Sequence, residues 1–386
     1  MNERLPGQDR PFRVGINGRF LSQKLTGVQR YAHEIVAALG RRHGAGQFGD
    51  TRFVTGLPAN AAGQAQTYAA FAEPVVGRHS GYRWEQLEFP AVPADILLNL
   101  CNLAPVRSKA NILCIHDANT FTAPESYGWR YRAVQRVALP LLSRRAAALV
   151  TVSHASAATI ASVSGVARER IFVAPNGHEH ALRWRPEAGT LDLDALTRRP
   201  FVVMLGSRAP HKNLALVREI APVLGQAGID VVVVGDAGSV FAGGGGDDGA
   251  LLCTGRISDD DIARLFGKAL CLVFPSFVEG FGLPIVEAMA LGCPVVASNT
   301  SCIPEICGEA ALLRSPSAPR DWIEAVTLLA AEPSRREALA KAGRERVKLF
   351  SWDRSAGIYA DLIDAFRRGE VRPVPPATGP GSKPTV

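Results

Sequence analysis

Two glutamates eight residues apart combine with glycines in a pattern that suits ligand binding. Glu279 lies in a glycine-rich loop after an apolar stretch, and Glu287 lies in the helix that follows, whose first position suits Pro284. A carboxylate accepts two hydrogen bonds at once, so it suits the paired hydroxyls of a ribose or a hexose. Glycines allow close backbone approach, and a helix amino terminus offers free N–H groups to an anion or to hydroxyls. The alternative is a helix start with solvated acids.

Two cations follow another apolar stretch, residues 201–205. Arg208 and Lys212 lie in the segment Gly206–Asn213, at the carboxyl end of this expected strand. Ligands bind at that end of parallel sheets. Two cations there can hold a diphosphate and stabilise its charge as it leaves. The alternative is a pair of surface cations at a helix start.

A polar pair, His116 and Asp117, follows the apolar stretch 112–115. At the carboxyl end of a strand both side chains are expected to point into a cleft. Two other interpretations stay open: a histidine bonded to nearby backbone, and an aspartate that orders its own loop.

The segment from Glu279 to Glu287 resembles the EX7E signature of the retaining GT-B glycosyltransferases of family 4, also called group 1. The resemblance covers nearly the whole chain. It implies an α/β protein of the GT-B fold, with two Rossmann-like doubly wound domains facing a central cleft. It also implies that Glu287 binds the ribose of a nucleotide sugar and that Glu279 contacts hydroxyls of the donor sugar. Backbone N–H groups would assist at Gly280, Phe281, Gly282 and Leu283.

The same resemblance implies roles for the other polar residues. Arg208 and Lys212 would stabilise the leaving diphosphate in place of a metal ion, so no metal or cofactor is expected. His116 would position the donor sugar rather than abstract a proton. Glu305 resembles a family position near the nucleotide, although an acid at a helix amino terminus explains it equally well.

The segment Thr26–Tyr31 looks like the family's T-G-[IV]-x-R-Y element. In that element the glycine lets the backbone approach the phosphates and the acceptor, which implicates Gly27. Acceptor-side roles are expected for the neighbouring polar residues Asn17, Arg19, Arg30 and Asp117.

Short apolar runs separated by helical stretches predict parallel sheets that are covered on both faces. Strands are expected at residues 12–17, 96–99, 112–115, 149–152, 201–205, 231–234, 270–274 and 294–297. Helices are expected at residues 28–39, 214–221, 259–266 and 284–290. We divide the chain into an acceptor-side domain (1–180), a nucleotide-sugar-binding domain (181–350), a helix returning to the first domain (351–370) and a disordered tail (371–386).

Composition excludes several classes of protein. A chain of 386 residues, 47% of them hydrophobic, with dispersed glycine and proline, is neither disordered nor collagen-like, and its length favours two domains. No apolar run approaches the roughly 20 residues of a membrane helix. The amino terminus is polar, and the seven cysteines form no CxxC pair. We therefore expect a soluble, cytoplasmic protein with free thiols.

The charge is concentrated in the first half of the chain. Residues 1–180 contain 20 Lys and Arg against 12 Asp and Glu, whereas residues 181–386 contain 23 against 24. The helical stretch 129–145 combines arginines with Trp129, Val137 and Leu141, a composition that suits peripheral contact with an anionic membrane. The alternative is a helix beside the acceptor cleft with a solvated basic side. The acidic second half and the lack of an aromatic–basic face argue against nucleic acid.

The sequence therefore predicts a metal-independent retaining hexosyltransferase that acts on a nucleotide-diphosphate sugar and on a glycan or lipid-linked glycan acceptor. Residues 116–121 and 26–31 look most like bacterial mannosyltransferases of surface polysaccharide assembly, so GDP-mannose is the first choice of donor. No second carboxylate has the place of a nucleophile, and the resemblance implies a front-side mechanism. A UDP-sugar donor and a GT-B nucleotide-sugar epimerase remain as alternatives. A NAD-dependent enzyme is disfavoured because no GxGxxG follows the first strand.

Overall fold

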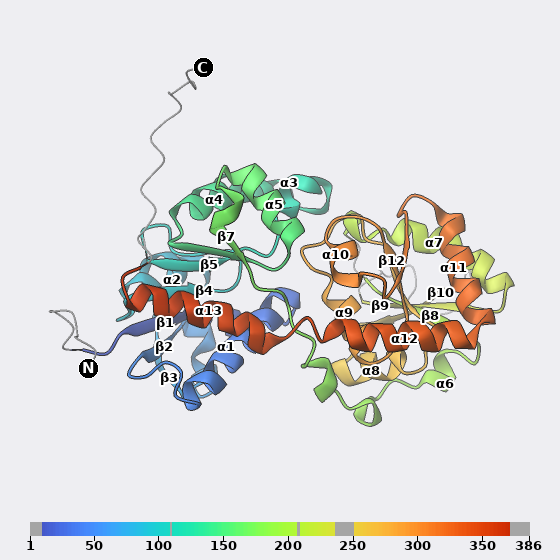
Figure 1. Ribbon diagram of the computed structural model, residues 1–386, viewed down its shortest axis with the longest axis horizontal. Coiled ribbons are helices and arrows are strands. Elements are labelled where there is room, and N and C mark those ends of the chain that lie inside the picture. The colour runs from blue at the N-terminus through green and yellow to red at the C-terminus, as the bar shows by residue number, and fades with distance from the viewer. Residues whose placement is uncertain (1–9, 109, 207–208, 236–250, 371–386) are drawn as a thin grey trace, which may run out of the picture.

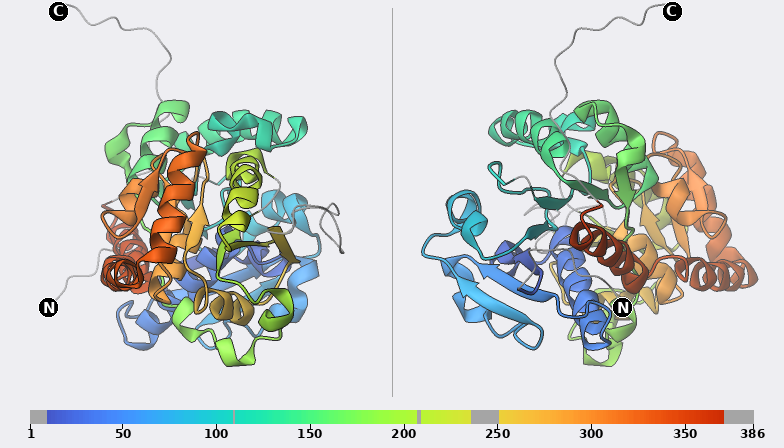
Figure 2. Two further views of the ribbon diagram at one scale, coloured as in Figure 1. Left: turned by 90° about the vertical axis from the view of Figure 1, so that its right-hand side faces the viewer. Right: turned by 60° about the vertical axis from the view of Figure 1, so that its left-hand side comes forward.

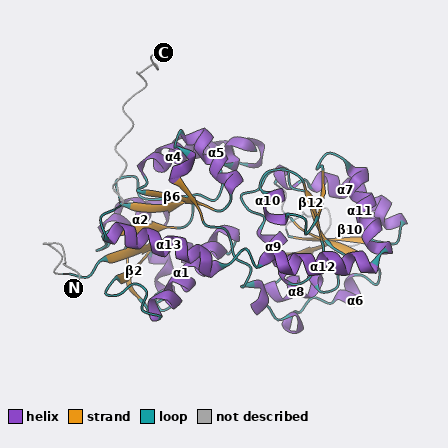
Figure 3. Cartoon of the chain, in the orientation of Figure 1, coloured by secondary structure: helices purple, strands orange, loops and turns teal. Residues whose placement is uncertain are grey.

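The structure is a computed structural model, and it describes residues 10–108, 110–206, 209–235 and 251–370. Within these ranges the chain folds into two α/β domains that lie side by side (Figure 1). Each domain has a parallel sheet at its centre and helices around it (Figure 3). The predicted fold class, two Rossmann-like doubly wound domains, is confirmed. The expected tail, residues 371–386, lies outside the described residues.

The first domain contains a seven-stranded parallel sheet of order β3-β2-β1-β4-β5-β6-β7. Its strands are β1 (Arg13–Asn17), β2 (Arg52–Leu57), β3 (Ala72–Val76), β4 (Ile96–Asn99), β5 (Asn111–Cys114), β6 (Ala148–Thr151) and β7 (Ile171–Val173). The central strands β4, β5 and β6 are buried at every position, as expected for a sheet covered on both faces. The direction of strand order reverses between β1 and β4, where such sheets open a crevice for ligands.

The second domain repeats this arrangement with six parallel strands of order β10-β9-β8-β11-β12-β13. They are β8 (Phe201–Leu205), β9 (Asp230–Val234), β10 (Leu251–Gly255), β11 (Leu272–Phe274), β12 (Val295–Ser298) and β13 (Leu312–Arg314). The order reverses between β8 and β11. The two strands that precede Lys212 and Glu279 along the chain are therefore the two that flank this crevice.

Helices cover both sheets. The first domain has α1 (Gly27–Gly44), α2 (Gly81–Leu87), α3 (Asn119–Thr122), α4 (Trp129–Arg145) and α5 (His154–Ser164). The second has α6 (Leu193–Leu196), α7 (Leu214–Gln226), α8 (Asp259–Phe266), α9 (Leu283–Ala290), α10 (Ile303–Cys307), α11 (Pro319–Ala331) and α12 (Pro333–Val347). In the described part of the chain no helix is both long and apolar enough to cross a bilayer. All seven cysteines are free, as expected.

The last described helix, α13 (Trp352–Arg367), follows α12 but packs along α1 of the first domain (Figures 1 and 2). Ser351 caps its amino terminus. The hydroxyls of Tyr31 and Tyr359 are 2.9 Å apart in the buried interface, and Arg42 pairs with Asp353 at 2.7 Å. The chain therefore returns to the first domain at its carboxyl end and ties the two domains together.

Candidate active site

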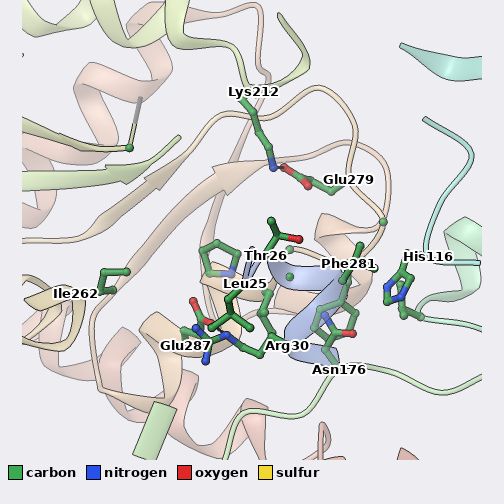
Figure 4. Close-up of a pocket in the computed structure, with 18 of the residues that line it drawn as sticks. Leu25, Thr26, Arg30, His116, Asn176, Lys212, Ile262, Glu279, Phe281 and Glu287 are labelled. Atoms are coloured by element: carbon green, nitrogen blue, oxygen red, sulfur yellow. Dashed lines mark hydrogen bonds and ion pairs between the residues drawn. The ribbon is translucent and has the colours of Figure 1, made fainter. Parts of the chain in front are cut away.

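A cavity of about 400 Å³ lies between the two domains, at the carboxyl ends of both sheets (Figure 4). This volume is within the range of pockets that enclose a small-molecule ligand. Segments after β1, β5, β8 and β11 line it, together with α9. The predicted site residues among its walls are Gly27, Arg30, His116, Asp117, Lys212, Glu279, Gly280, Phe281, Gly282, Leu283 and Glu287. Arg208 lies outside the described residues.

Asn17 and Arg19, for which acceptor-side roles were predicted, are not among the residues that line this cavity. Both are buried, and they form a polar network with Glu85 of α2. Asn17 Nδ2 donates to Glu85 Oε1 at 2.9 Å, and Arg19 Nη1 lies 3.2 Å from Glu85 Oε2. Burial raises the pKa of the Glu85 carboxyl, and the Arg19 charge opposes that shift. These residues therefore order the segment after β1.

Glu305 does not line the cavity either. Its carboxylate accepts hydrogen bonds from the backbone N–H groups of His154 (2.9 Å) and Ala155 (3.1 Å), in the first turn of α5. The reason is electrostatic, because a carboxylate is stabilised at a helix amino terminus. Glu305 thus joins the two domains, and its contacts favour the alternative interpretation, an acid at a helix amino terminus.

Arg30 lines the cavity and contacts two acids of the second domain. Its Nη2 donates to both carboxylate oxygens of Asp259, at 2.8 and 2.7 Å, and its Nε lies 3.9 Å from Glu287 Oε1. Arg30 lies in the first turn of α1 and Asp259 in the first turn of α8, so the two helix starts face each other across the gap between the domains. Arg30 therefore contributes positive charge near Glu287.

The loop between β11 and α9 depends on its glycines. Gly282 has φ +94°, a conformation that favours glycine. A Cβ at Gly280 would lie 2.8 Å from the His116 carbonyl oxygen, so only glycine permits this close approach. The Gly280 carbonyl accepts hydrogen bonds from Ser153 Oγ (2.7 Å) and Ser156 Oγ (3.0 Å) of the first domain. Sequence reasoning missed both serines, because nothing in their spacing indicates a partner in another domain.

Two helix amino termini meet at the cavity. A Cβ at Gly27, the first residue of α1, would lie 3.8 Å from the side chain of Leu283, the first residue of α9. Both residues line the cavity. Helix amino termini favour anions through their free N–H groups and their dipoles. The cavity is therefore suited to a phosphate group at this end.

Lys212 and Glu279 point toward each other across the cavity and form an ion pair (Figure 4). The distance from Lys212 Nζ to Glu279 Oε1 is 2.6 Å. Asp117 is close enough to interact with both: burial and the Glu279 charge raise the pKa of its carboxyl, and Lys212 opposes the shift. Among the described residues, Lys212 is thus shared between two carboxylates. A ligand phosphate would compete with them for Lys212.

Glu287 is anchored by a relay of two buried residues that the sequence did not indicate. Trp352 Nε1 donates to His180 Nδ1 at 3.0 Å, and His180 Nε2 lies 2.9 Å from Glu287 Oε1. The indole N–H can only donate, so Nδ1 accepts and Nε2 has the proton that bonds Glu287. The relay fixes the direction of the Glu287 carboxylate toward the cavity.

His116 is held as a neutral acceptor. Its Nε2 lies 2.8 Å from the Leu100 carbonyl oxygen, which can only accept, so Nε2 has the proton and Nδ1 is free to accept. The Tyr31 ring packs edge-on against the imidazole at 4.9 Å. Burial lowers the pKa of His116 to about 4. The side chain can therefore accept a hydrogen bond from a ligand hydroxyl at neutral pH.

This pKa shift predicts a pH-dependent stability. The unfolded chain binds a proton at His116 below about pH 6.5, whereas the folded protein does so only below about pH 4. The free energy of unfolding should therefore fall by up to about 3 kcal/mol as pH drops through that window. Chemical denaturation from pH 7 to pH 4 measures it. In His116→Gln the free energy of unfolding should decline less steeply, because the His116 contribution is gone. Some decline should remain, because burial also lowers the pKa values of His33 and His211. An equal decline in the wild type and in His116→Gln would contradict the lowered pKa of His116.

No set of three or more His, Cys, Asp or Glu side chains is arranged to hold a metal ion anywhere in the described ranges. Among the described residues, the charged side chains that line the cavity are Arg30, Asp117, Lys212, Arg256, Asp259, Glu279 and Glu287.

Two parallel Rossmann-like sheets with a ligand-sized cavity between them define the GT-B class of fold. WaaG, a glycosyltransferase involved in lipopolysaccharide biosynthesis, superimposes with a TM-score of 0.61 at 15% identity, over 91% of this chain and 99% of that one. HepE of Anabaena, solved with UDP and glucose, superimposes with a TM-score of 0.65 at 18% identity, over 92% and 100%.

The sequence relatives agree with this class. Residues 192–346 match the family of glycosyl transferases group 1. The O-antigen chain mannosyltransferase B of Escherichia coli is 29% identical over 263 residues, 64% of this chain and 68% of that protein. The MMP alpha-(1->4)-mannosyltransferase of Mycolicibacterium hassiacum is 30% identical over 242 residues, 60% and 56%. Residues 192–346 therefore form a group 1 glycosyltransferase domain, which confirms the family resemblance for this part of the chain.

Proposed function

We propose that this protein is a metal-independent, retaining hexosyltransferase that moves mannose from GDP-mannose to a glycan or a lipid-linked glycan. One observation carries the proposal. Lys212, Glu279 and Glu287 of the second domain share one cavity with Gly27 and His116 of the first. Positive charge, paired carboxylates and two helix amino termini in one cavity suit a sugar joined to a diphosphate.

Each side chain has a distinct task in this proposal. Glu287 binds the ribose hydroxyls, and Glu279 binds hydroxyls of the donor sugar. Lys212 stabilises negative charge on the diphosphate as the bond to the sugar breaks. His116 accepts a hydrogen bond from a donor hydroxyl through Nδ1. In a front-side reaction the leaving phosphate oxygen takes the acceptor proton, so no further protein base is needed.

The names of the relatives support mannose as the transferred sugar. Both relatives described above are named mannosyltransferases. The HepE structure contains UDP, so a UDP-sugar donor is the alternative within the same class. A GT-B epimerase, which would convert the donor without an acceptor, is the remaining alternative.

The experiment that tests the donor is a calorimetric titration of GDP, UDP and ADP, and of their hexose conjugates, in EDTA. The proposal predicts micromolar binding of GDP and GDP-mannose alone. Tight binding of UDP would indicate a UDP-sugar donor in place of GDP-mannose and would leave the proposed enzyme class unchanged. Binding that requires a divalent metal would contradict metal independence, and conversion of the donor without an acceptor would favour the epimerase.

We also propose that α4 brings the enzyme to the cytoplasmic face of an anionic membrane. The side chains of Trp129 and Val137 are each 69% exposed, beside the exposed arginines Arg130 and Arg136. Apolar side chains among cations suit the interface of a bilayer with anionic headgroups.

This proposal predicts sedimentation with phosphatidylglycerol vesicles that declines as salt increases. The double variant Trp129→Ala/Val137→Ala should bind several-fold more weakly. Leu349→Ala, at an exposed position of the second domain, is the matched control. Equal binding to phosphatidylcholine vesicles, or an unaffected double variant, would argue for a solvated helix instead.

A further inference from the structure

A second cavity, of about 210 Å³, lies within the first domain and adjoins the first one. The residues around it come from the start of α1, from the segments after β4 and β5 and from α4. They are Val28, Asn102, Ile115, Asp117, Thr120, Tyr127, Tyr131, Gln135 and Leu139. Asp117 lines both cavities. The volume is below the range of about 300–1,000 Å³ for pockets that enclose a whole drug-sized ligand, so this cavity suits a single ring.

One wall of the second cavity is aromatic. The rings of Tyr127 and Tyr131 stack with their centroids 5.7 Å apart and their planes 27° from parallel. The Tyr127 ring also stacks on His211 of the second domain, at 6.2 Å. Stacked rings offer a flat apolar surface, and a pyranose presents a flat face of C–H groups that packs on such a surface.

A polar group in this wall has no partner. Thr120 is 6% exposed, and its Oγ1 is buried without a hydrogen bond among the described residues. A buried hydroxyl is normally satisfied, so an unpaired one that lines a cavity indicates a partner on a bound molecule. The Gln135 amide, 3.3 Å from the Tyr131 hydroxyl, adds a second polar group to the same cavity. The ligand should therefore have hydroxyl groups.

The charge of the second cavity disfavours phosphate. Among the described residues, those that line it include Asp117 and no lysine or arginine. The nearby cation Arg19 is already paired with Glu85 and lies over the Tyr82 ring, with 4.5 Å from its guanidinium carbon to the ring centroid. Lys212, the cation that interacts with Asp117, lines the first cavity and pairs with Glu279 at 2.6 Å. A carboxylate on this side repels an anion and accepts hydrogen bonds from neutral hydroxyls.

We infer that this second cavity binds the terminal, unphosphorylated sugar ring of the acceptor, packed against the wall of Tyr127 and Tyr131 and hydrogen-bonded by Thr120. Asp117 then contacts the acceptor hydroxyl that faces the donor cavity. This inference rests on the proposed function, and it narrows the acceptor to a neutral glycan end. A phosphorylated sugar or cyclitol is excluded as the group bound here.

The test measures acceptor and nucleotide binding separately. Nucleoside diphosphates are titrated first. Neutral methyl glycosides of mannose, glucose, galactose and N-acetylglucosamine are then titrated by NMR with nucleotide bound, beside mannose 6-phosphate and inositol 3-phosphate. We expect at least one neutral glycoside to bind and neither phosphate ester to compete with it. Thr120→Val should weaken glycoside binding about five- to tenfold and leave nucleotide binding unchanged.

Thr122→Val is the matched control, because Thr122 is exposed and lies two residues further along α3. It should bind glycosides like the wild type. Tighter binding of a phosphate ester, no binding of any neutral glycoside, or an unaffected Thr120→Val would overturn the inference while nucleotide binding persists. Loss of all nucleotide binding in the wild type would instead contradict the proposed function.

Discussion

Replacing Lys212 with alanine is expected to lower turnover about a hundredfold, the scale for removing one group that stabilises developing charge. Lys212 is the described cation that reaches Glu279 in the cavity, at 2.6 Å. Its loss removes the stabiliser of the leaving phosphate and also the ion-pair partner of the Glu279 carboxylate, which lies near Asp117. Donor turnover, measured on the same preparation as nucleoside-diphosphate affinity, reports the loss of leaving-group stabilisation. The affinity reports the change of charge in the binding site.

The matched control is Lys348→Ala. Lys348 also pairs with a glutamate, Glu345, at 2.7 Å, but both side chains are about two thirds exposed. An exposed pair contributes little, so this variant should keep wild-type activity and stability. Full activity in Lys212→Ala would mean that the leaving group is stabilised elsewhere, and Arg208 would then be the next residue to replace.

The fold could be predicted where apolar runs are continuous. Strand β9, Asp230–Val234, consists almost entirely of valine, and β8 is also apolar. Their sequences therefore predict strands that are buried on both faces of a sheet. Sequence analysis missed β2, β3, β7, β10 and β13. The strands β3, β7, β10 and β13 form the edges of the two sheets, where burial is incomplete. Pro74 in β3 further weakens its strand pattern.

The site could be predicted in part, for a reason of topology. Residues that directly follow a strand, such as His116 and Lys212, reach the edge of the sheet that faces the cavity. Residues whose partners are distant in sequence could not be predicted. His180 contacts Glu287, which is 107 residues away in the sequence, and Glu305 accepts a hydrogen bond from the backbone of His154, which is 151 residues away. The ion pair of Arg30 with Asp259 could not be predicted for the same reason, because Asp259 belongs to the other domain.

The anchoring of Glu287 makes its role testable apart from folding. His180 bonds one carboxylate oxygen and Arg30 lies 3.9 Å from the same atom, Oε1. A ribose can then bond the other oxygen and share the first. His180→Phe removes the anchor and keeps the carboxylate, so it should raise the donor KM less than loss of Glu287 itself.

Replacing Glu287 with alanine is expected to raise the donor KM by one to two orders of magnitude, while kcat stays within a few-fold. Hydrogen bonds to a charged group contribute about 1.5–3 kcal/mol, and each 1.4 kcal/mol is tenfold in affinity. The ribose does not change charge during transfer, so its contacts act on binding alone. A donor nucleotide without ribose hydroxyls sharpens the test: it should bind weakly to the wild type and equally weakly to Glu287→Ala. Glu309→Ala, an exposed acid after α10, should leave KM unchanged. If Glu287→Ala still binds the nucleotide without ribose hydroxyls more weakly than the ordinary nucleotide, another residue binds the ribose.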